Sequence, residues 1–355
     1  MAQKVVVIGA GILGAATAYE LQKSGSDVTV IDSGQGGATQ ASFGWINASF
    51  YLDADHFRLR QQSLTAYRGL AKELSLPINW CGALCFETEG AEFDAQAAEL
   101  AELGYAFDVI DREAFAALVP ELQTPPERCL RFAQEAAADS GKLAQALLDA
   151  AVEKGAQVVR GVTATRFVMA GDRITGVETT AGQFSADDVV CAVGMASEHL
   201  LSTVEVALPM LKRPGAMIRT RPVQRVAKEI LVSPIGEIRQ LADGSLMMPT
   251  AVSHQSDTSE NIASLPQDAD AALARLRGMF PNLDLHLAEV TLAQRPVPKD
   301  NFPVVGLAKD GLYALCAHSG VTLAAVLGQL VAKEVRDGPS NETATTLAPY
   351  RPDRF

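Results

Sequence analysis

Three glycines near the N-terminus have a spacing that suits a dinucleotide. Gly9, Gly11 and Gly14 stand between an apolar run and a helical stretch, and Asp32 closes a second, β-branched run. In such a unit the first glycine permits a sharp turn, the second admits a pyrophosphate and the third lets the helix pack on the sheet. The helix N-terminus stabilises phosphate charge, and Asp32 can accept hydrogen bonds from a ribose. Residues 4–32 therefore predict a dinucleotide site without separating NAD from FAD.

The composition is that of an ordinary globular protein. The chain has 355 residues, of which 48% are hydrophobic and 20% charged, and this length favours two domains. Its net charge of -12 would repel nucleic acid and anionic membranes. Five cysteines without a regular framework are typical of a reducing compartment, and no apolar run has the roughly 18–20 residues that a membrane span needs. We therefore expect a cytoplasmic protein with neither a nucleic-acid partner nor a membrane span.

The sequence offers little that would bind a metal. Cys81 and Cys85 lie in a strand-like run with no second cysteine pair nearby, so we expect them to pack in the core. His56, His199 and His286 have no ligand spacing, which indicates surface or packing roles. We predict no metal site.

The loop after Asp32 is rich in glycine and small residues. It can wrap the phosphates of a cofactor and then bring residues 43–47 towards its ring. Trp45 and Phe50 are too apolar for this segment to be only a flexible surface loop exposed to solvent. Helical spacing at residues 56–74 follows this loop.

Residues 78–138 alternate short strands and helices in a way that fits an inserted α+β lobe. Strands are expected at 78–87 and 107–110, and helices at 92–103 and 112–118.

The next segment separates two classes of nucleotide-binding protein. A helix capped by Asp139 or Ser140 and ended by Gly155 leads into short strands with hairpin signals, and then into a buried strand at 189–193. Simple NAD enzymes repeat βα units instead, so this antiparallel flap favours FAD.

Residues 208–294 again alternate as strands, with one helix near 269–279, and should complete the second lobe. The chain then returns with a strand at 312–316 and a helix at 321–335. From about residue 338 it is a polar, proline-containing extension.

Taken in this order, the motifs GAGILG, ADDVVCAVGMAS, RPVPKDNFPVVG and GLYALCAHSGVTLAAVLG resemble those of the D-amino-acid-oxidase-like family of FAD-dependent amine and amino-acid oxidoreductases. That family includes glycine oxidase, sarcosine oxidases and D-amino-acid dehydrogenases. The resemblance spans nearly the whole chain and implies an α/β plus α+β fold. In this fold a Rossmann-like FAD-binding domain of the glutathione-reductase type, built from separated segments, joins a mainly antiparallel β substrate domain. We expect residues 1–77, 139–207 and 295–355 to bind FAD, and residues 78–138 and 208–294 to bind substrate.

The resemblance also implies a set of cofactor-binding residues. Asp32 stands where many relatives have a ribose-binding Glu, and Val162 resembles a flap residue whose backbone meets the adenine. The start of the last helix lies where the family holds the pyrimidine side of the flavin, and amide donors there would stabilise negative charge on the reduced ring. The full set is Gly9, Gly11, Ile12, Leu13, Gly14, Asp32, Ser33, Thr39, Ser42, Phe43, Gly44, Trp45, Val162, Ala192, Gly194, Arg295, Gly320, Val321, Thr322 and Leu323.

Arg295 and His318 are the first candidates for substrate contact. Arg295 stands where glycine-oxidase-like relatives place an arginine, and a guanidinium can hold a carboxylate through two parallel hydrogen bonds. A surface ion pair is the alternative. At His318 such relatives often carry another arginine, and imidazole cannot form the same fork. His318 could therefore only brace the turn before Gly320.

His254, Trp45 and Asn47 complete the candidates. His254 follows a strand of the second lobe and could reach the substrate or be solvated, and Trp45 and Asn47 could present a ring and an amide to the flavin. Trp45 could equally be a core residue. Met247 and Met248 occupy a strand in which monomeric sarcosine oxidases carry a lysine that promotes reaction with oxygen, and this favours a dehydrogenase.

Together, these expectations describe an FAD-dependent amino-acid or amine dehydrogenase. Hydride would pass from the α carbon of a neutral amine to flavin N5, and the resulting imine would hydrolyse, so the protein's task is orientation and electrostatics. Cys316 lies in a buried strand, so we expect non-covalent FAD. One alternative is an oxidase that uses oxygen. Another is the flavin subunit of a multi-chain dehydrogenase, with an electron-acceptor protein or partner subunit. A non-catalytic nucleotide-binding module would have no use for the second lobe.

Overall fold

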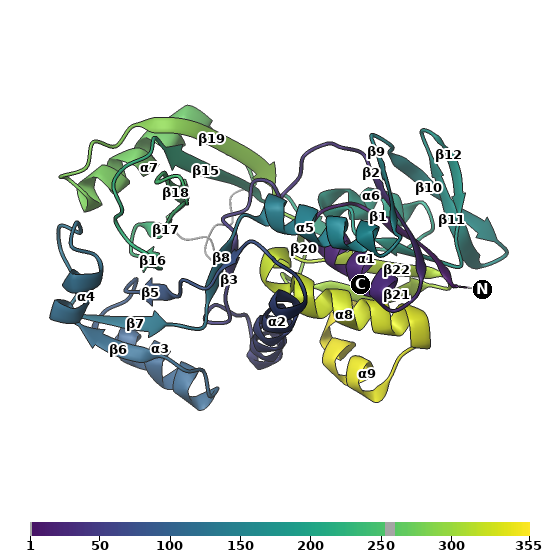
Figure 1. The fold of residues 1–355 in the computed structure, drawn as a ribbon, viewed down its shortest axis with the longest axis horizontal. Coiled ribbons are helices and arrows are strands. Elements are labelled where there is room, and N and C mark those ends of the chain that lie inside the picture. The colour runs from purple at the N-terminus through teal and green to yellow at the C-terminus, as the bar shows by residue number, and fades with distance from the viewer. Residues whose placement is uncertain (1, 253–259) are drawn as a thin grey trace.

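The computed structural model describes residues 2–252 and 260–355. Its strands form two large sheets, which lie on the left and right of Figure 1. No helix in the described part of the chain is long and apolar enough to cross a membrane. The expected α/β plus α+β fold is confirmed.

The six-stranded sheet contains the strands on both sides of the glycine motif. Its order is β21-β22-β13-β1-β2-β9, and all neighbours are parallel except β21 and β22. The strands come from three separated parts of the chain. Their bounds are β1 (Lys4–Ile8), β2 (Asp27–Asp32), β9 (Gln157–Arg160), β13 (Asp188–Cys191), β21 (Val304–Lys309) and β22 (Leu312–Cys316).

Alternate residues of β1 face opposite layers, because successive side chains of a strand point to opposite faces. Val5 and Val7 pack with the helices on one face, whereas Val6 and Ile8 pack with a three-stranded antiparallel sheet on the other. The helices are α1 (Ile12–Lys23), α5 (Ser140–Glu153) and α8 (Gly320–Asp337), and the small sheet is β10 (Ala164–Ala170), β11 (Arg173–Thr179) and β12 (Gly182–Ser185). This small sheet is the flap predicted from the hairpin signals.

The helices α1 and α8 approach each other closely through small residues. A Cβ added to Gly328 would lie 2.9 Å from the carbonyl carbon of Ala16, so a larger residue at position 328 would force the helices apart. Helix α2 (Ala54–Glu73) packs on α8 and lies beside it in Figure 1.

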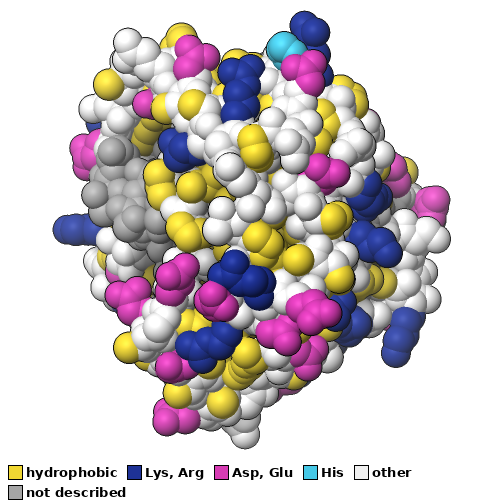
Figure 2. All heavy atoms as spheres, turned by 90° about the vertical axis from the view of Figure 1, so that its left-hand side faces the viewer, with side chains coloured by type: hydrophobic (Ala, Val, Ile, Leu, Met, Phe, Trp, Pro, Cys, Tyr) yellow, Lys and Arg dark blue, Asp and Glu magenta, His cyan; other side chains and the backbone are white. Residues whose placement is uncertain are grey.

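The eight-stranded sheet is antiparallel except where β5 meets β16. Its order is β19-β15-β18-β17-β16-β5-β7-β6, and α4 (Arg112–Leu118) and α7 (Leu265–Met279) contribute to its core. The face in Figure 2 carries acidic and basic side chains interspersed with apolar ones. The strand bounds are β5 (Ala83–Cys85), β6 (Asp108–Asp111), β7 (Arg128–Phe132), β15 (Pro214–Thr220), β16 (Ile230–Ser233), β17 (Gly236–Gln240), β18 (Leu246–Pro249) and β19 (Leu287–Gln294).

A small sheet, β3-β8-β4, joins segments from different parts of the chain. Of the remaining elements, α3 lies between β5 and β6 of the eight-stranded sheet, and the others connect the two large sheets or follow α8. Their bounds are β3 (Trp45–Ile46), β4 (Ile78–Asn79), α3 (Gly90–Glu102), β8 (Ala136–Ala138), α6 (Ser197–Ser202), β14 (Met210–Leu211), β20 (Val297–Pro298) and α9 (Asn341–Leu347). All strands of the eight-stranded sheet come from residues 78–138 and 208–294. The assignment of the two parts to FAD and to substrate stays a prediction.

Two local expectations were wrong. The single strand expected at residues 78–87 is broken into β4 and β5, because Gly82 turns the chain with φ +79° beside the carbonyl oxygen of Phe132. The C-terminal extension is folded rather than a simple polar tail. It contains α9, whose last residue Leu347 is buried, and Tyr350 after the helix is buried as well.

An ion pair fixes this C-terminal segment to α8. Arg351 donates to both carboxylate oxygens of Glu334, one at 2.7 Å, and the Glu334 side chain is only 1% exposed. The hydrogen bonds with Glu334 raise the pKa of Arg351. Glu334 therefore depends on Arg351 for its charge compensation.

We expect Arg351→Met to destabilise the protein by about 3–5 kcal/mol, since it leaves a buried carboxylate without its cation. Urea unfolding measures the change. The matched control is Lys333→Met, which removes the ion pair between the exposed side chains of Lys333 and Glu342. This variant should lose at most about 1 kcal/mol of unfolding free energy. Equal losses in the two variants would contradict a special role for the buried pair.

Candidate functional site

A cavity of about 1740 Å³ runs between the two large sheets. Its wall includes the β1–α1 turn, the loop after β2, the start of α8 and inward-facing residues of β15, β17 and β19. Sites for drug-sized ligands typically have about 300–1,000 Å³. This cavity is therefore large enough for an extended ligand together with a small second molecule.

The glycine turn at one end of the cavity requires glycine on geometric grounds. Gly9 has φ +104°, and a Cβ there would lie 2.5 Å from the carbonyl oxygen of Ala192. A Cβ on Gly14 would lie 1.9 Å from the carbonyl oxygen of Gly9. Gly11 lines the cavity, where a ligand can approach its backbone. The sharp turn at Gly9 and the close packing at Gly14 are as the sequence pattern predicted, and the approach of a pyrophosphate to Gly11 stays a prediction.

Polar side chains hold the loop after β2 against the N-terminus of α1. The backbone N–H of Ile12 donates to Thr39 Oγ1 at 3.1 Å. The half-buried Asp32 accepts from the backbone N–H groups of Ala10 and Gly34, each at 2.8 Å. A carboxylate has about four acceptor positions, so Asp32 can still accept from hydroxyl groups in the cavity.

The start of α8 forms a second helix N-terminus on the cavity wall. Gly320, Val321 and Thr322 line the cavity. On α2, Tyr67 donates to the carbonyl of Val321 and Ser63 to that of Thr322, both at 2.6 Å. A polar stripe on α2 therefore fixes where α8 begins.

Arg60 belongs to the same stripe and is buried. Its Nε donates to the carbonyl oxygen of Asn47 at 3.1 Å, its Nη2 to Asn47 Oδ1, and its Nη1 to Ser319 Oγ at 2.8 Å. Burial lowers the pKa of Arg60 to about 10, so the side chain remains a cation at neutral pH. The Asn47 side chain is thus held in place by Arg60.

Glu135 is a second buried charged group in this region. It accepts from Trp45 Nε1 at 2.9 Å, from the Ser49 backbone N–H at 3.0 Å and from the Tyr105 hydroxyl at 2.7 Å. Burial raises the pKa of Glu135, while these hydrogen bonds oppose the rise. The Trp45 side chain is 7% exposed, so it is anchored in the core as well as lining the cavity.

Arg295 and His318 line the cavity from different elements. Arg295 follows β19, and its Nε donates to the carbonyl oxygen of Arg213 at 3.2 Å while its methylene groups lie against Gly215. His318 precedes α8. Glu237 of β17, a 5% exposed carboxylate, also lines the cavity. His254 lies outside the described residues.

Most of the predicted site residues share this one cavity. Gly14 and Leu323 are not on its described wall; Gly14 provides the close packing of α1, and Leu323 is fully buried. The predicted residues on the wall are Gly9, Gly11, Ile12, Leu13, Asp32, Ser33, Thr39, Ser42, Phe43, Gly44, Trp45, Asn47, Val162, Ala192, Gly194, Arg295, His318, Gly320, Val321 and Thr322.

A scan with protein-family models matches residues 4–334 to the family described as DAO, FAD dependent oxidoreductase. The chain belongs to this family. It is 27% identical to a D-amino acid dehydrogenase of Cereibacter sphaeroides over an alignment of 389 positions, gaps included, which covers 91% of this chain and 89% of the relative.

Two solved structures share the fold of this chain. The glycine oxidase of Geobacillus kaustophilus superposes with a TM-score of 0.87 at 21% identity, covering 99% of each chain. An L-proline dehydrogenase from P. horikoshii gives a TM-score of 0.86 at 20% identity, covering 100% of this chain and 98% of the other.

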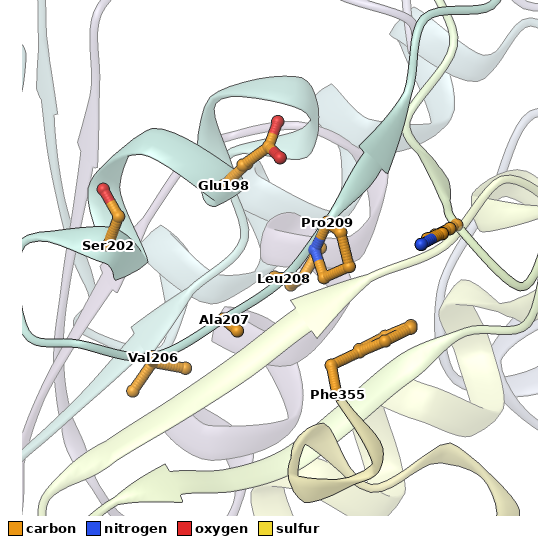
Figure 3. A pocket seen from close by; sticks show the side chains of 8 residues that line it. Glu198, Ser202, Val206, Ala207, Leu208, Pro209 and Phe355 are labelled. Carbon is orange, nitrogen blue, oxygen red and sulfur yellow. The ribbon is translucent and has the colours of Figure 1, made fainter.

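The residues of this FAD-dependent oxidoreductase fit the cofactor of its family. The cavity has a tight glycine turn at Gly9, an acid at Asp32 and two helix N-termini that favour negative charge. A second, smaller hollow of about 470 Å³ (Figure 3) lies elsewhere, between Glu198, Ser202, Lys299 and Phe355, and contains neither the glycine turn nor Asp32. The described residues contain no group of three or more His, Cys, Asp or Glu that could hold a metal ion.

Four buried charged residues of this region were not predicted as site residues: Arg60, Glu135, Glu237 and Arg239. Arg239 donates to the carbonyl oxygen of Ala138 at 2.8 Å and lies over the Phe43 ring. Only Arg60 carried a usable signal, because it stands on the apolar stripe of its helix, three residues after Phe57. Met248, which suggested a dehydrogenase, is buried in the core of the eight-stranded sheet.

His56 is buried next to this network and is held neutral. Its Nδ1 accepts from the Leu52 backbone N–H at 3.2 Å, and the side chain is 3% exposed. Burial, assisted by the charges of Arg60 and His318, lowers the pKa of His56 to about 3. The unfolded chain, with an ordinary histidine pKa, binds a proton at His56 more readily than the folded chain does, so the stability that His56 contributes is complete above the unfolded pKa and is lost as the pH falls.

We expect His56→Gln to reduce the pH dependence of stability. Between about pH 7 and about pH 5, the wild-type protein should lose about 1–2 kcal/mol more unfolding free energy than the variant. Urea unfolding at the two pH values measures this difference. His286→Gln, at an exposed histidine beside Asp284, is the control and should keep the wild-type pH dependence. A His56→Gln profile identical to wild type would contradict a buried neutral imidazole.

Proposed function

We propose that the cavity binds one FAD non-covalently and in an extended conformation. The ADP half would lie on the glycine turn and Asp32, with the adenine towards Val162 and the flavin ring towards Asn47 and the start of α8. The positions of these residues on one continuous wall support this arrangement. Cys316 supports non-covalent binding, because its Sγ faces the carbonyl oxygen of Gly194 in the core and burial raises its pKa to about 12.

We infer that the substrate is an amino acid or a related secondary amine, oxidised at its C–N bond. The observation that carries this proposal is the place of Arg295 on the cavity wall, directly after β19 of the eight-stranded sheet. A guanidinium there can hold a substrate carboxylate by two parallel hydrogen bonds. The names of the relatives, which include D-amino acid dehydrogenase, glycine oxidase and L-proline dehydrogenase, agree with such a substrate.

The residues of this chain would bind and orient the substrate. When bound, FAD supplies the acceptor for the hydride that leaves the substrate's α carbon. Arg295 would fix the carboxylate and so the direction of the Cα–H bond. Glu237, on the same wall, would accept a hydrogen bond from the neutral amino group of the substrate. His318 would contact the substrate from the side of α8. The imine product would then react with water to give a keto acid or aldehyde and ammonia or an amine.

We propose a dehydrogenase, which passes electrons to an acceptor protein or to a partner subunit. The name of the Cereibacter sphaeroides relative, D-amino acid dehydrogenase, supports this choice.

An anaerobic screen of D- and L-amino acids, N-methyl amino acids and cyclic imino acids tests the proposed function. The purified protein should be yellow, should release FAD on denaturation, and should lose its oxidised flavin absorbance with at least one member of the panel. A colourless protein that binds no added FAD would exclude the proposal. In air, release of hydrogen peroxide at the rate of turnover would show an oxidase instead.

Arg295→Met should lower kcat/KM for the best amino-acid substrate by about 100-fold or more, because a charged contact to the carboxylate is lost. FAD content should stay near wild type. Steady-state kinetics measure the loss of kcat/KM for the amino acid and for the corresponding amine without its carboxylate. The loss should be absent for the amine without the carboxylate. Arg221→Met, at an exposed arginine of β15's C-terminal side, controls for the change of net charge. Equal losses on both amines would contradict the carboxylate contact.

A further inference from the structure

Arg60 places a buried positive charge on the cavity wall. The residue is 4% exposed and lies on α2, and it reaches the wall between Asn47 and Ser319. Ser319 directly precedes the first turn of α8. The charge of Arg60 therefore stands beside a helix N-terminus that is itself positive.

The hydrogen-bond partners of Arg60 do not neutralise its charge. Within the described chain, its three donor groups bond to the carbonyl and amide oxygens of Asn47 and to the hydroxyl of Ser319, all of which are neutral. Glu135 opposes the pKa decrease of Arg60 through its electrostatic field. Glu135 itself is directed to Trp45, Tyr105 and the backbone at Ser49. The cation and the acid thus belong to separate hydrogen-bond sets.

If Arg60 only held two loops together, a charged side chain would destabilise the fold more than a neutral donor would. Neutral donors could satisfy the same three oxygens, whereas a buried charge costs several kcal/mol of desolvation unless an opposite charge compensates it. The field of Arg60 is strong in the low-dielectric wall, and with the N-terminus of α8 it favours negative charge in the adjacent part of the cavity.

We propose that Arg60 raises the reduction potential of the bound flavin, by stabilising the negative charge that the ring gains when it accepts two electrons and one proton. Arg60 acts through its charge as a positioning residue and not as a contact to substrate. This inference rests on the flavin placement given under the proposed function, in which the ring lies towards Asn47 and the start of α8.

The test compares midpoint potentials of three purified, FAD-loaded variants with wild type by anaerobic dye titration. Arg60→Met removes the charge and should shift the equilibrium at least tenfold towards oxidised flavin, which is about 30 mV for a two-electron couple. Arg60→Lys keeps the charge and should shift it less than Arg60→Met does. Arg58→Met is the matched control, because Arg58 is an exposed cation on the same helix, paired with Asp55. It should leave the potential unchanged.

Stability and FAD affinity are measured on the same samples to separate a structural role from an electrostatic one. A purely structural Arg60 would lower the melting temperature of Arg60→Met and leave the potential of the bound flavin at the wild-type value, and that result overturns the inference. It would leave the proposed function intact. If wild type itself contains no flavin, the proposed function fails first.

If Arg60→Met does not accumulate as folded protein, a measurement on the wild-type enzyme tests the inference instead. The pH dependence of its midpoint potential in mildly acidic buffer gives the number of protons taken up with two electrons. Uptake of one proton means that the reduced ring stays anionic beside the cation, and supports the inference. Uptake of two protons means that the reduced ring is neutral there, and overturns it.

Discussion

The close packing of α1 against α8 is the constraint on which the site depends. The two helices approach through Ala16 and Gly328, and each begins at the same cavity. Because a helix N-terminus carries a partial positive charge, this one contact gives the cavity two regions that favour an anion. The two regions suit a dinucleotide that carries a redox-active ring. Its pyrophosphate is always charged, and its ring becomes charged on reduction.

The polar interior between the sheets determines where the second of these regions lies. Helix α2 presents Arg60, Ser63 and Tyr67 on one stripe, and each of these residues bonds to the loop or the first turn around the start of α8. Buried polar groups of this kind are costly unless they are fully hydrogen-bonded. The arrangement therefore stabilises one position of α8 more than any slightly shifted one, and a rigid wall results.

The sequence predicted the features that depend on local pattern. The glycine turn, the strand that ends at Asp32 and the helix over residues 112–118 follow from spacing, propensity and the need for glycine at particular contacts. The family resemblance then brought distant segments together, and 20 of the predicted residues lie on one cavity wall. Among the strands that were missed is β8, whose partners β3 and β4 are remote in sequence.

The charged residues of the site were harder to predict for a physical reason. A charged residue on a helix is normally solvated, and the burial of Arg60 depends on Ser319, which is 259 positions away. Similarly, Glu135 is 90 positions from Trp45. The apolar stripe of its helix can mark Arg60 as a buried residue, but neither partner is visible from local periodicity. The partners are found only when the chain is folded.

The small sheet of β3, β8 and β4 has a mechanical consequence. Its strands pair residues 45–46 and 78–79 with residues 136–138, and the chain crosses between the regions of the two large sheets beside this joint. Domain closure by a hinge needs a few compliant connections, but here the connections are cross-linked by backbone hydrogen bonds. A hinge motion that separated the regions of the two large sheets at this joint would break these backbone hydrogen bonds. Entry and exit of small molecules must therefore proceed through local movement at the rim of the cavity, while the two halves stay in register.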